Sequence, residues 1–188
     1  MKTWIPRFAM IFTIIFCGQA VASFDGQNVQ GDYFFPNLAT TLNPPVSAIV
    51  GPGIEFNDFP SGDQRTDVDI SANNILITYI SGPSSWTSAD FNGAVFSDPD
   101  GTIPAITGVS INPATTMVGL DASRVSFDAD SVSINWNGLN FDVDTIVSLD
   151  VQFGATATPA PVPTLPLGLL FLLAAGLGLA GTRHLKRA

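Results

Sequence analysis

The sequence predicts an all-β protein whose central segment, residues 23–153, folds as an antiparallel β-sandwich. Short runs in this segment alternate apolar and polar residues with a period of two, as half-buried strands do. Gly, Pro, Asn, Asp and Ser recur between the runs, where turns are needed. About 130 residues can bury most of the apolar faces of two packed sheets. The strand order, jelly-roll or immunoglobulin-like, is left open, and an up-and-down barrel is the alternative.

The predicted strands follow one another along the central segment. Residues 66–71 place Val68 and Ile70 on one face and polar side chains on the other, because successive Cβ atoms of a strand point to opposite faces. Residues 74–80 are more apolar throughout, which is typical of a strand buried on both faces. The remaining alternating runs are residues 124–127, 131–136 and 147–153.

Two Asn-Gly pairs mark predicted turns, Asn92-Gly93 and Asn137-Gly138. Both central residues of a type I′ turn need a positive φ, which Asn and Gly tolerate best. The second pair lies between two apolar runs and therefore predicts a β-hairpin. Further turn signals lie at residues 51–53, 61–63 and 98–101.

Residues 1–22 have the three parts of a secretory signal peptide. A basic start precedes an apolar run of about ten residues, and Ala20 and Ala22 form the Ala-x-Ala site that signal peptidase recognises. An uncleaved anchor is the alternative, although the apolar run is shorter than the roughly 20 residues that a membrane-spanning helix needs. We therefore expect cleavage after Ala22 and export of the rest of the chain.

The central segment contains neither cysteine nor histidine, since Cys17 lies in the signal peptide and His184 near the C-terminus. Their absence excludes Ser-His-Asp and Cys-His nucleophilic sites, histidine acid–base chemistry and zinc sites built on imidazole or thiolate. Carboxylates, hydroxyls and amides remain. We predict that the protein is not an enzyme.

Negative charge dominates the central segment. All 16 acidic residues lie between Asp25 and Asp150, and only Arg65 and Arg124 oppose them, which leaves a net charge of −14. Such a surface repels nucleic acids and anionic lipid headgroups and attracts cations. We therefore predict no nucleic-acid partner.

Four aspartates are candidate calcium ligands: Asp98 and Asp100 in an Asp-Pro-Asp-Gly sequence, and the pair Asp128 and Asp130. Ca²⁺ takes six to eight oxygen ligands, and aspartate is a common donor. The alternative is that Asp-Pro-Asp-Gly forms a turn and that the other pair keeps a strand soluble. Calcium is the only cofactor that the sequence suggests.

Trp86, in a Ser-Ser-Trp-Thr-Ser loop, is the candidate exposed aromatic that could stack on a sugar ring. Trp136 is instead in phase with Val132 and Ile134, which places it in the predicted core. A carbohydrate- or calcium-binding surface module is therefore the alternative to a purely structural role.

Two aspartate pairs have the spacing of strand neighbours on one face, Asp67 with Asp69 and Asp142 with Asp144. Carboxylates at positions i and i+2 lie about 6.5–7 Å apart, which overlaps the separation found in inverting glycosidases. The same spacing arises on any solvated strand face, and this is the interpretation that we favour.

The C-terminal part combines three features. Residues 154–164 form a Pro-rich linker, residues 165–188 begin with an apolar helix of about 16 residues, roughly 24 Å long, and Arg183, Lys186 and Arg187 form a basic tail. The positive-inside rule keeps that tail cytoplasmic and directs the N-terminal part outward. A permanent single-span anchor is one interpretation.

This arrangement, with its Pro-Val-Pro-Thr-Leu-Pro sequence, resembles the PEP-CTERM class of bacterial sorting signals and its Val-Pro-x-x-Pro relatives. The resemblance implies an exosortase-type transpeptidase as partner and cleavage near Val162, Pro163 and Pro166. It also implies a transient inner-membrane anchor, then release to the cell surface or extracellular matrix, in a biofilm envelope rich in exopolysaccharide. The glutamate of the Pro-Glu-Pro form is missing. We expect a structural or adhesive surface protein.

Overall fold

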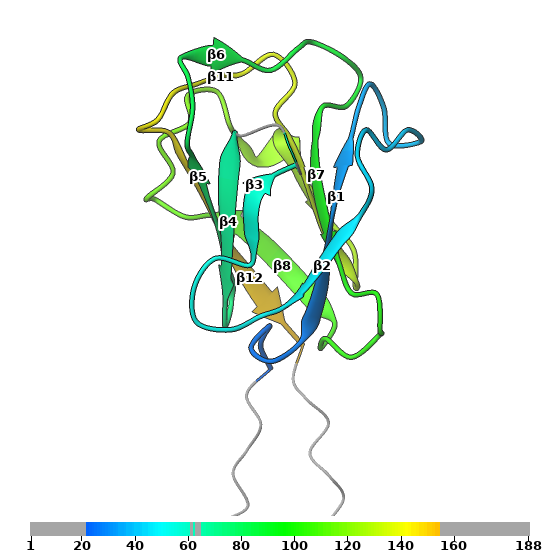
Figure 1. Ribbon diagram of the computed structural model, residues 1–188. Coiled ribbons are helices and arrows are strands. Elements are labelled where there is room, and N and C mark those ends of the chain that lie inside the picture. The colour runs from blue at the N-terminus through cyan, green and yellow to red at the C-terminus, as the bar shows by residue number, and fades with distance from the viewer. Residues whose placement is uncertain (1–21, 61, 63–64, 155–188) are drawn as a thin grey trace, which may run out of the picture. The chain divides into compact units, whose positions relative to one another are not determined.

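Two antiparallel five-stranded sheets pack face to face in the computed structural model, which describes residues 22–60, 62 and 65–154 (Figure 1). The first sheet has the order β2 (Val46–Ile49), β1 (Asn28–Phe34), β7 (Gly93–Ser97), β10 (Ser131–Asn135), β9 (Val125–Phe127). The second has the order β3 (Phe56–Phe59), β4 (Thr66–Ser71), β5 (Asn74–Tyr79), β12 (Ile146–Phe153), β8 (Ile106–Ile111). A short ribbon pairs β11 (Asn140–Phe141) with β6 (Ser84–Ser85). The only helical turn in the described part of the chain is the 3₁₀ helix η1 (Ala122–Arg124), so the all-β prediction is confirmed.

The strand order excludes the up-and-down barrel that was the alternative to a sandwich. In the first sheet β1 lies beside β7, and β7 lies beside β10, so half of the neighbouring strands in the two five-stranded sheets are not consecutive in the chain. An up-and-down order would instead pair each strand with the next one along the chain. The connections therefore cross between the two sheets and leave long loops at both ends of the sandwich.

The β4–β5 hairpin shows how the alternating pattern builds a sheet. Val68 and Ile70 of β4 are fully buried, as predicted. In β5, Ile75 and Ile77 are fully buried, whereas Leu76 is only half-buried on the other face. The expectation of a strand buried on both faces is thus wrong, because no layer of the described residues packs over this face of the second sheet, and even an apolar side chain there is partly in solvent.

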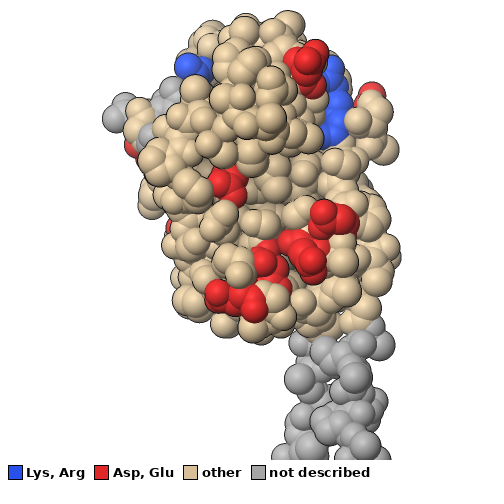
Figure 2. Space-filling view, turned by 90° about the vertical axis from the view of Figure 1, so that its right-hand side faces the viewer, with Lys and Arg blue, Asp and Glu red and all other residues tan. Residues whose placement is uncertain are grey.

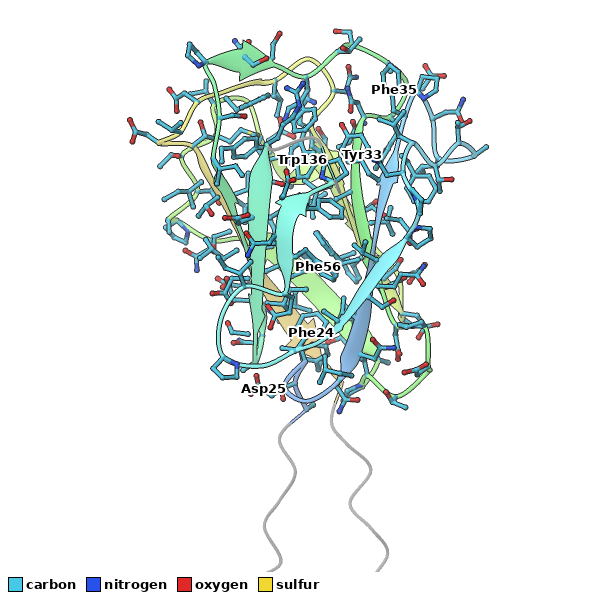
Figure 3. The ribbon with its side chains drawn as sticks, in the orientation of Figure 1. Phe24, Asp25, Tyr33, Phe35, Phe56 and Trp136 are labelled. Carbon is cyan, nitrogen blue, oxygen red and sulfur yellow. The ribbon has the colours of Figure 1, made fainter. Side chains whose placement is uncertain are left out.

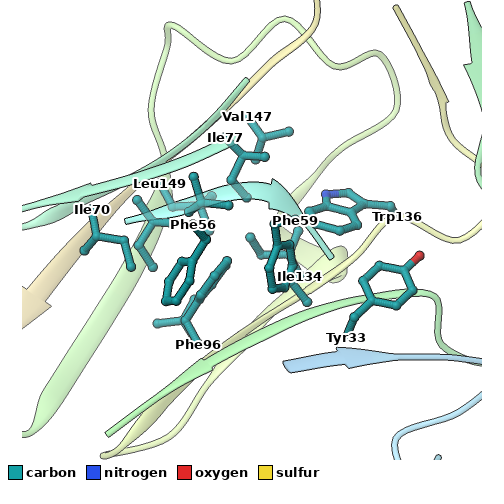
Figure 4. Close-up of a cluster of buried hydrophobic side chains, with 14 of the residues drawn as sticks. Tyr33, Phe56, Phe59, Ile70, Ile77, Phe96, Ile134, Trp136, Val147 and Leu149 are labelled. Carbon is teal, nitrogen blue, oxygen red and sulfur yellow. The ribbon is translucent and has the colours of Figure 1, made fainter. Parts of the chain in front are cut away.

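The core lies between the sheets and is rich in aromatic rings (Figure 4). Phe56 and Phe59 of the second sheet pack on Phe96 of the first, with ring centroids 6.0 and 5.7 Å apart. Gly31 makes room for them, since a Cβ there would lie 3.1 Å from the Phe59 ring. Burial of each such side chain stabilises the fold by about 1.5–3 kcal/mol.

The predicted hairpin at Asn137-Gly138 is wrong, although the turn itself is present. Gly138 has a φ of +69°, and the Leu139 N–H donates to the Trp136 carbonyl at 2.8 Å. The strand that follows pairs with β6 and not with β10. Arg124 contacts this turn, because its Nη1 donates to the Asn137 carbonyl at 2.8 Å and to the Asn135 carbonyl at 3.3 Å.

The other Asn-Gly pair, Asn92-Gly93, serves close packing between strands. Gly93 opens β7, where it pairs with Asn135 of β10 and Phe34 of β1. A Cβ on Gly93 would lie 1.8 Å from the Ile134 carbonyl oxygen, so only glycine fits. The sequence signal was real, but it marks a close backbone approach and not a turn.

Both ends of the described chain meet at one end of the sandwich, which we call the near end and define by residues 22–27, 50–55, 98–105 and 128–130 (Figure 3). The Phe24 and Phe153 rings touch edge to face, with centroids 4.9 Å apart. The Phe24 N–H donates to the Ala72 carbonyl, and the Gly154 N–H donates to the Ala105 carbonyl, each at 2.8 Å. The opposite, far end consists of residues 80–92, 112–121 and 136–145 and carries β6 and β11 (Figure 1).

Candidate functional site

Two hollows open at the far end and share Ser85 as a lining residue. The larger has a volume of about 920 Å³ and the smaller about 200 Å³. The larger hollow is lined by Pro83, Ser84, Ser85, Thr116, Val118, Asn140, Phe141, Asp142, Asp144 and Thr145. Its size lies within the range of about 300–1,000 Å³ that is common for small-molecule sites.

A tight turn after β11 forms one wall of the larger hollow. Asp142 Oδ1 accepts hydrogen bonds from the Asp144 N–H at 3.1 Å and from the Thr145 hydroxyl at 2.9 Å. The Asp142 N–H in turn donates to Thr145 Oγ1 at 2.9 Å. Asp142 and Asp144 therefore lie on a turn and not on a strand face, which removes the strand-face geometry considered for them as a glycosidase pair.

A second part of the lining is fastened to the start of β12. The Thr116 N–H donates to the Ile146 carbonyl at 2.9 Å, and the Ile146 N–H donates to Thr116 Oγ1 at 2.8 Å. Thr116 Oγ1 also donates to the Asp144 carbonyl at 3.2 Å. Val118, two residues further on, is 85% exposed at the rim. This part of the lining is thus held by the backbone and hydroxyl of Thr116, while the Val118 side chain faces solvent.

Gly82 allows the loop before β6 to lie directly on the turn after β11. Its φ is +135°, and a Cβ there would lie 2.8 Å from the Asp142 Cα and 3.1 Å from the Phe141 carbonyl oxygen. A side chain at this position would therefore force two backbone segments apart. The hollow owes its shape to this approach.

Trp86 is buried beneath the far-end loops, so the expectation of an exposed aromatic is wrong. Only 5% of the residue is exposed, because its indole stacks on Trp136 with centroids 5.1 Å apart and an interplanar angle of 18°. Its Nε1–H donates to the Tyr79 hydroxyl at 3.2 Å. The Arg65 guanidinium lies over the indole, 5.5 Å from the ring centroid. Trp136 is fully buried, as predicted (Figure 3).

The aromatic cluster also holds two tyrosines. The Tyr33 hydroxyl donates to Asn92 Oδ1. The centroid of the Tyr33 ring lies 5.6 Å from that of Trp86 and 6.2 Å from that of Trp136. Burial raises the pKa of Tyr79 well above its usual value, an effect that the hydrogen bond from Trp86 opposes only in part. Tyr79 is therefore neutral over the physiological pH range.

The candidate calcium ligands lie at the near end, where they cap their own turns. Asp98 accepts three backbone hydrogen bonds, from Asp100, Gly101 and Ile103, at 2.7–3.1 Å. Hydrogen bonds from the Asp130 backbone and the Ser131 hydroxyl and backbone lower the pKa of Asp128. The two loops adjoin, since the Asp98 N–H donates to the Asp130 carbonyl at 3.0 Å.

The four carboxylates do not belong to a metal-binding group among the described residues. No group of three or more His, Cys, Asp or Glu side chains that could hold a metal ion occurs among the described residues. On the face of the molecule drawn in Figure 2, acidic side chains gather on the half toward the near end. Calcium binding by Asp98, Asp100, Asp128 and Asp130 stays a prediction.

The first aspartate pair lies on the outer face of β4. Asp67 Oδ1 accepts a hydrogen bond from the Asp58 N–H at 2.9 Å, at an irregularity where Asp58 has a φ of +56°. Asp67 therefore has a structural contact with the edge strand β3. The arrangement agrees with the interpretation of this pair as part of a partly solvated strand face.

The sorting and processing residues fall mostly outside the described residues. Ala22 is the first described residue and is half-buried. Ala20, Val162, Pro163, Pro166, Arg183, Lys186 and Arg187 lie in the segments that are not described. Within residues 22–60, 62 and 65–154, no helix is long and apolar enough to cross a membrane.

Sequence reasoning overlooked most of the larger hollow. Pro83 and Thr116 come from two separate loops and Asn140 from the two-residue strand β11, and nothing in their local sequence distinguishes them from ordinary turn residues. The weak signal available was the clustering of Asp142, Asp144 and Thr145 after a short apolar run. Comparisons of the chain with protein-family models, curated proteins and solved structures give no match.

Proposed function

We propose that this chain is a non-enzymatic exported protein, displayed at a bacterial cell surface or in the extracellular matrix after sorting through its C-terminal segment. Support comes first from the sequence. A signal peptide precedes a domain without cysteine or histidine, and a Pro-rich linker, an apolar segment and a basic tail follow it.

The contact between Phe24 and Phe153 is the structural observation that carries the proposal. A domain that is held by a tether beyond residue 154 presents to its surroundings the end that lies farthest from the tether. Here both described ends of the chain leave from the near end (Figure 1). A structural or adhesive role in a polysaccharide-rich envelope needs this geometry, since the far-end loops then face outward.

The carboxylates of the domain support the non-enzymatic part of the proposal. General acid–base pairs need one carboxyl group with a raised pKa, but the two aspartates with a resolved shift, Asp121 and Asp128, have their pKa lowered by hydrogen bonds within their own turns. Asp98 and Asp142 are likewise acceptors of hydrogen bonds in their own turns. These groups act as caps of loops.

The absence of cysteine from the central segment provides a clean test. Val118→Cys places one thiol on an 85% exposed far-end position. We expect a membrane-impermeant maleimide to label this variant on intact producing cells, while the parent protein stays unlabelled because Cys17 is removed with the signal peptide. Labelling that appears only after the inner membrane is broken would place the domain inside the cell and refute the proposal.

A further inference from the structure

We infer that the larger far-end hollow is a binding site for a neutral saccharide, with Asp144, Asp142, Asn140 and Ser84 as its polar contacts. This inference goes beyond the proposed location at the cell surface, and it can be wrong even if that location is right. It also differs from the sugar platform predicted at Trp86, which is buried.

The chemistry of the lining matches a polyhydroxylated ligand. Sugar rings present neighbouring hydroxyl groups, which donate to carboxylates and exchange hydrogen bonds with hydroxyls and amides. The hollow offers these acceptors on exposed side chains, and the Asp144 carboxylate has no hydrogen-bond partner among the described residues. Asp142 uses Oδ1 within its turn, which leaves Oδ2 directed to no described donor.

An apolar surface lies next to the polar groups. Val118 is the most exposed large hydrophobic residue of the described chain, at 85%, and Pro83, which also lines the hollow, is exposed. An exposed valine at the rim of a polar hollow suits the C–H face of a sugar ring, because contact with it removes apolar surface from water.

The walls are formed before any ligand arrives. The reciprocal bonds between Thr116 and Ile146, the Asp142–Thr145 turn and the close approach at Gly82 all fix backbone segments. A ligand therefore has to order only a few exposed side chains, which reduces the entropic cost of binding.

Charge selects the class of saccharide. The two carboxylates of the hollow and the net charge of −14 on the central segment repel uronate, sulfate and phosphate groups. A metal is a poorer match, since no group of three acidic or histidine side chains that could hold one occurs in the described part of the chain. Neutral sugars and N-acetylated amino sugars remain.

Titration calorimetry on the protein purified from its producing cells tests the site directly. The probes are cellohexaose, N-acetylchitohexaose and the neutral polysaccharide fraction of the same culture, with polygalacturonate as the acidic comparison. We expect saturable binding of at least one neutral probe and none of polygalacturonate. No saturable binding of any neutral probe, or stronger binding of polygalacturonate, would overturn the inference.

Two variants with the same change of charge locate the ligand. Asp144→Asn removes the carboxylate at the hollow, whereas Asp25→Asn removes an exposed carboxylate at the near end. Loss of a hydrogen bond to a charged group predicts a roughly ten-fold weaker affinity for Asp144→Asn and no change for Asp25→Asn. Equal affinities in both variants would place the ligand elsewhere and refute the site. Because the assay uses purified protein, its result is independent of where the cell sends the chain.

Discussion

The indoles of Trp86 and Trp136 lie 5.1 Å apart and within 18° of parallel, which joins the loop before β7 to the loop after β10. Tyr33, Tyr79 and Phe141 surround this pair. The cluster forms the floor beneath the far-end loops, so the shape of those loops depends on an aromatic core as well as on their own local turns.

Replacing Trp136 tests that dependence. Trp136→Ala should lower the free energy of unfolding by about 3–5 kcal/mol, because it removes a fully buried ring and leaves a cavity among the other aromatics. Val118→Ala, at an exposed far-end position, should stay within about 0.5 kcal/mol of the parent. Urea unfolding followed by far-UV circular dichroism gives both values. Similar stabilities for the two variants would contradict the assigned floor.

Substituting two glycines with positive φ compares the cost of backbone strain alone with the cost of strain combined with steric contact. Gly101→Ala introduces a Cβ into open space at a φ of +67°, which should cost about 1 kcal/mol. Gly82→Ala adds contacts at 2.8 and 3.1 Å with the backbone of residues 141 and 142, and should cost about 3 kcal/mol or more. Thermal unfolding of both variants measures the difference. An equal loss of Tm would mean that the loops are not held together as described.

The buried Tyr79 hydroxyl should make the free energy of unfolding depend on pH in the alkaline range. Its pKa in the folded protein lies above the reference value of 10.0, so the folded state holds a proton that the unfolded state releases once the pH passes that value. The contribution of the Tyr79 hydroxyl to the free energy of unfolding is therefore fully present below about pH 10, and it falls as the pH rises above that value. Tyr79→Phe cannot ionise and should flatten the slope of unfolding free energy between about pH 9.5 and 11. An unchanged slope in this variant would contradict the burial of the hydroxyl.

The orientation of the domain predicts different access to its two ends. Ile54 lies in a near-end loop and is 49% exposed, and Val118 lies at the far end. On intact cells, a bulky polyethylene-glycol maleimide should react faster with Val118→Cys than with Ile54→Cys, because the near end faces the tether. The purified variants supply the reference rates in solution. A faster reaction of Ile54→Cys on cells, relative to that reference, would mean that the domain presents the other end.

Period-two alternation predicts five of the twelve described strands, β4, β5, β9, β10 and β12, because burial on one face of a sheet imposes this pattern on the sequence. Val68, Ile70, Ile134 and Trp136 were placed in the core on that basis, and all four are fully buried. Pairing was harder to predict. The partner of residues 140–141 is β6, a two-residue strand of serines that has no strand pattern of its own.

The hollow could not be predicted from local sequence, because distant loops meet there through backbone contacts. Thr116 reaches Ile146, and Gly82 touches Asp142, across separations that no short motif encodes. Trp86 was expected to be exposed because its neighbours in sequence are polar. Its environment is instead set by Trp136 and Tyr79, which the topology brings beneath it.

Intact-mass spectrometry of the protein from its producing cells tests the central claim most directly. If the chain is exported and sorted through its C-terminal segment, its mass should correspond to a start at Ser23 and an end between residues 154 and 166. Deletion of the exosortase-type enzyme should then shift the end to Ala188. A cell-derived mass that spans Met1 to Ala188 in the presence of that enzyme would contradict the account.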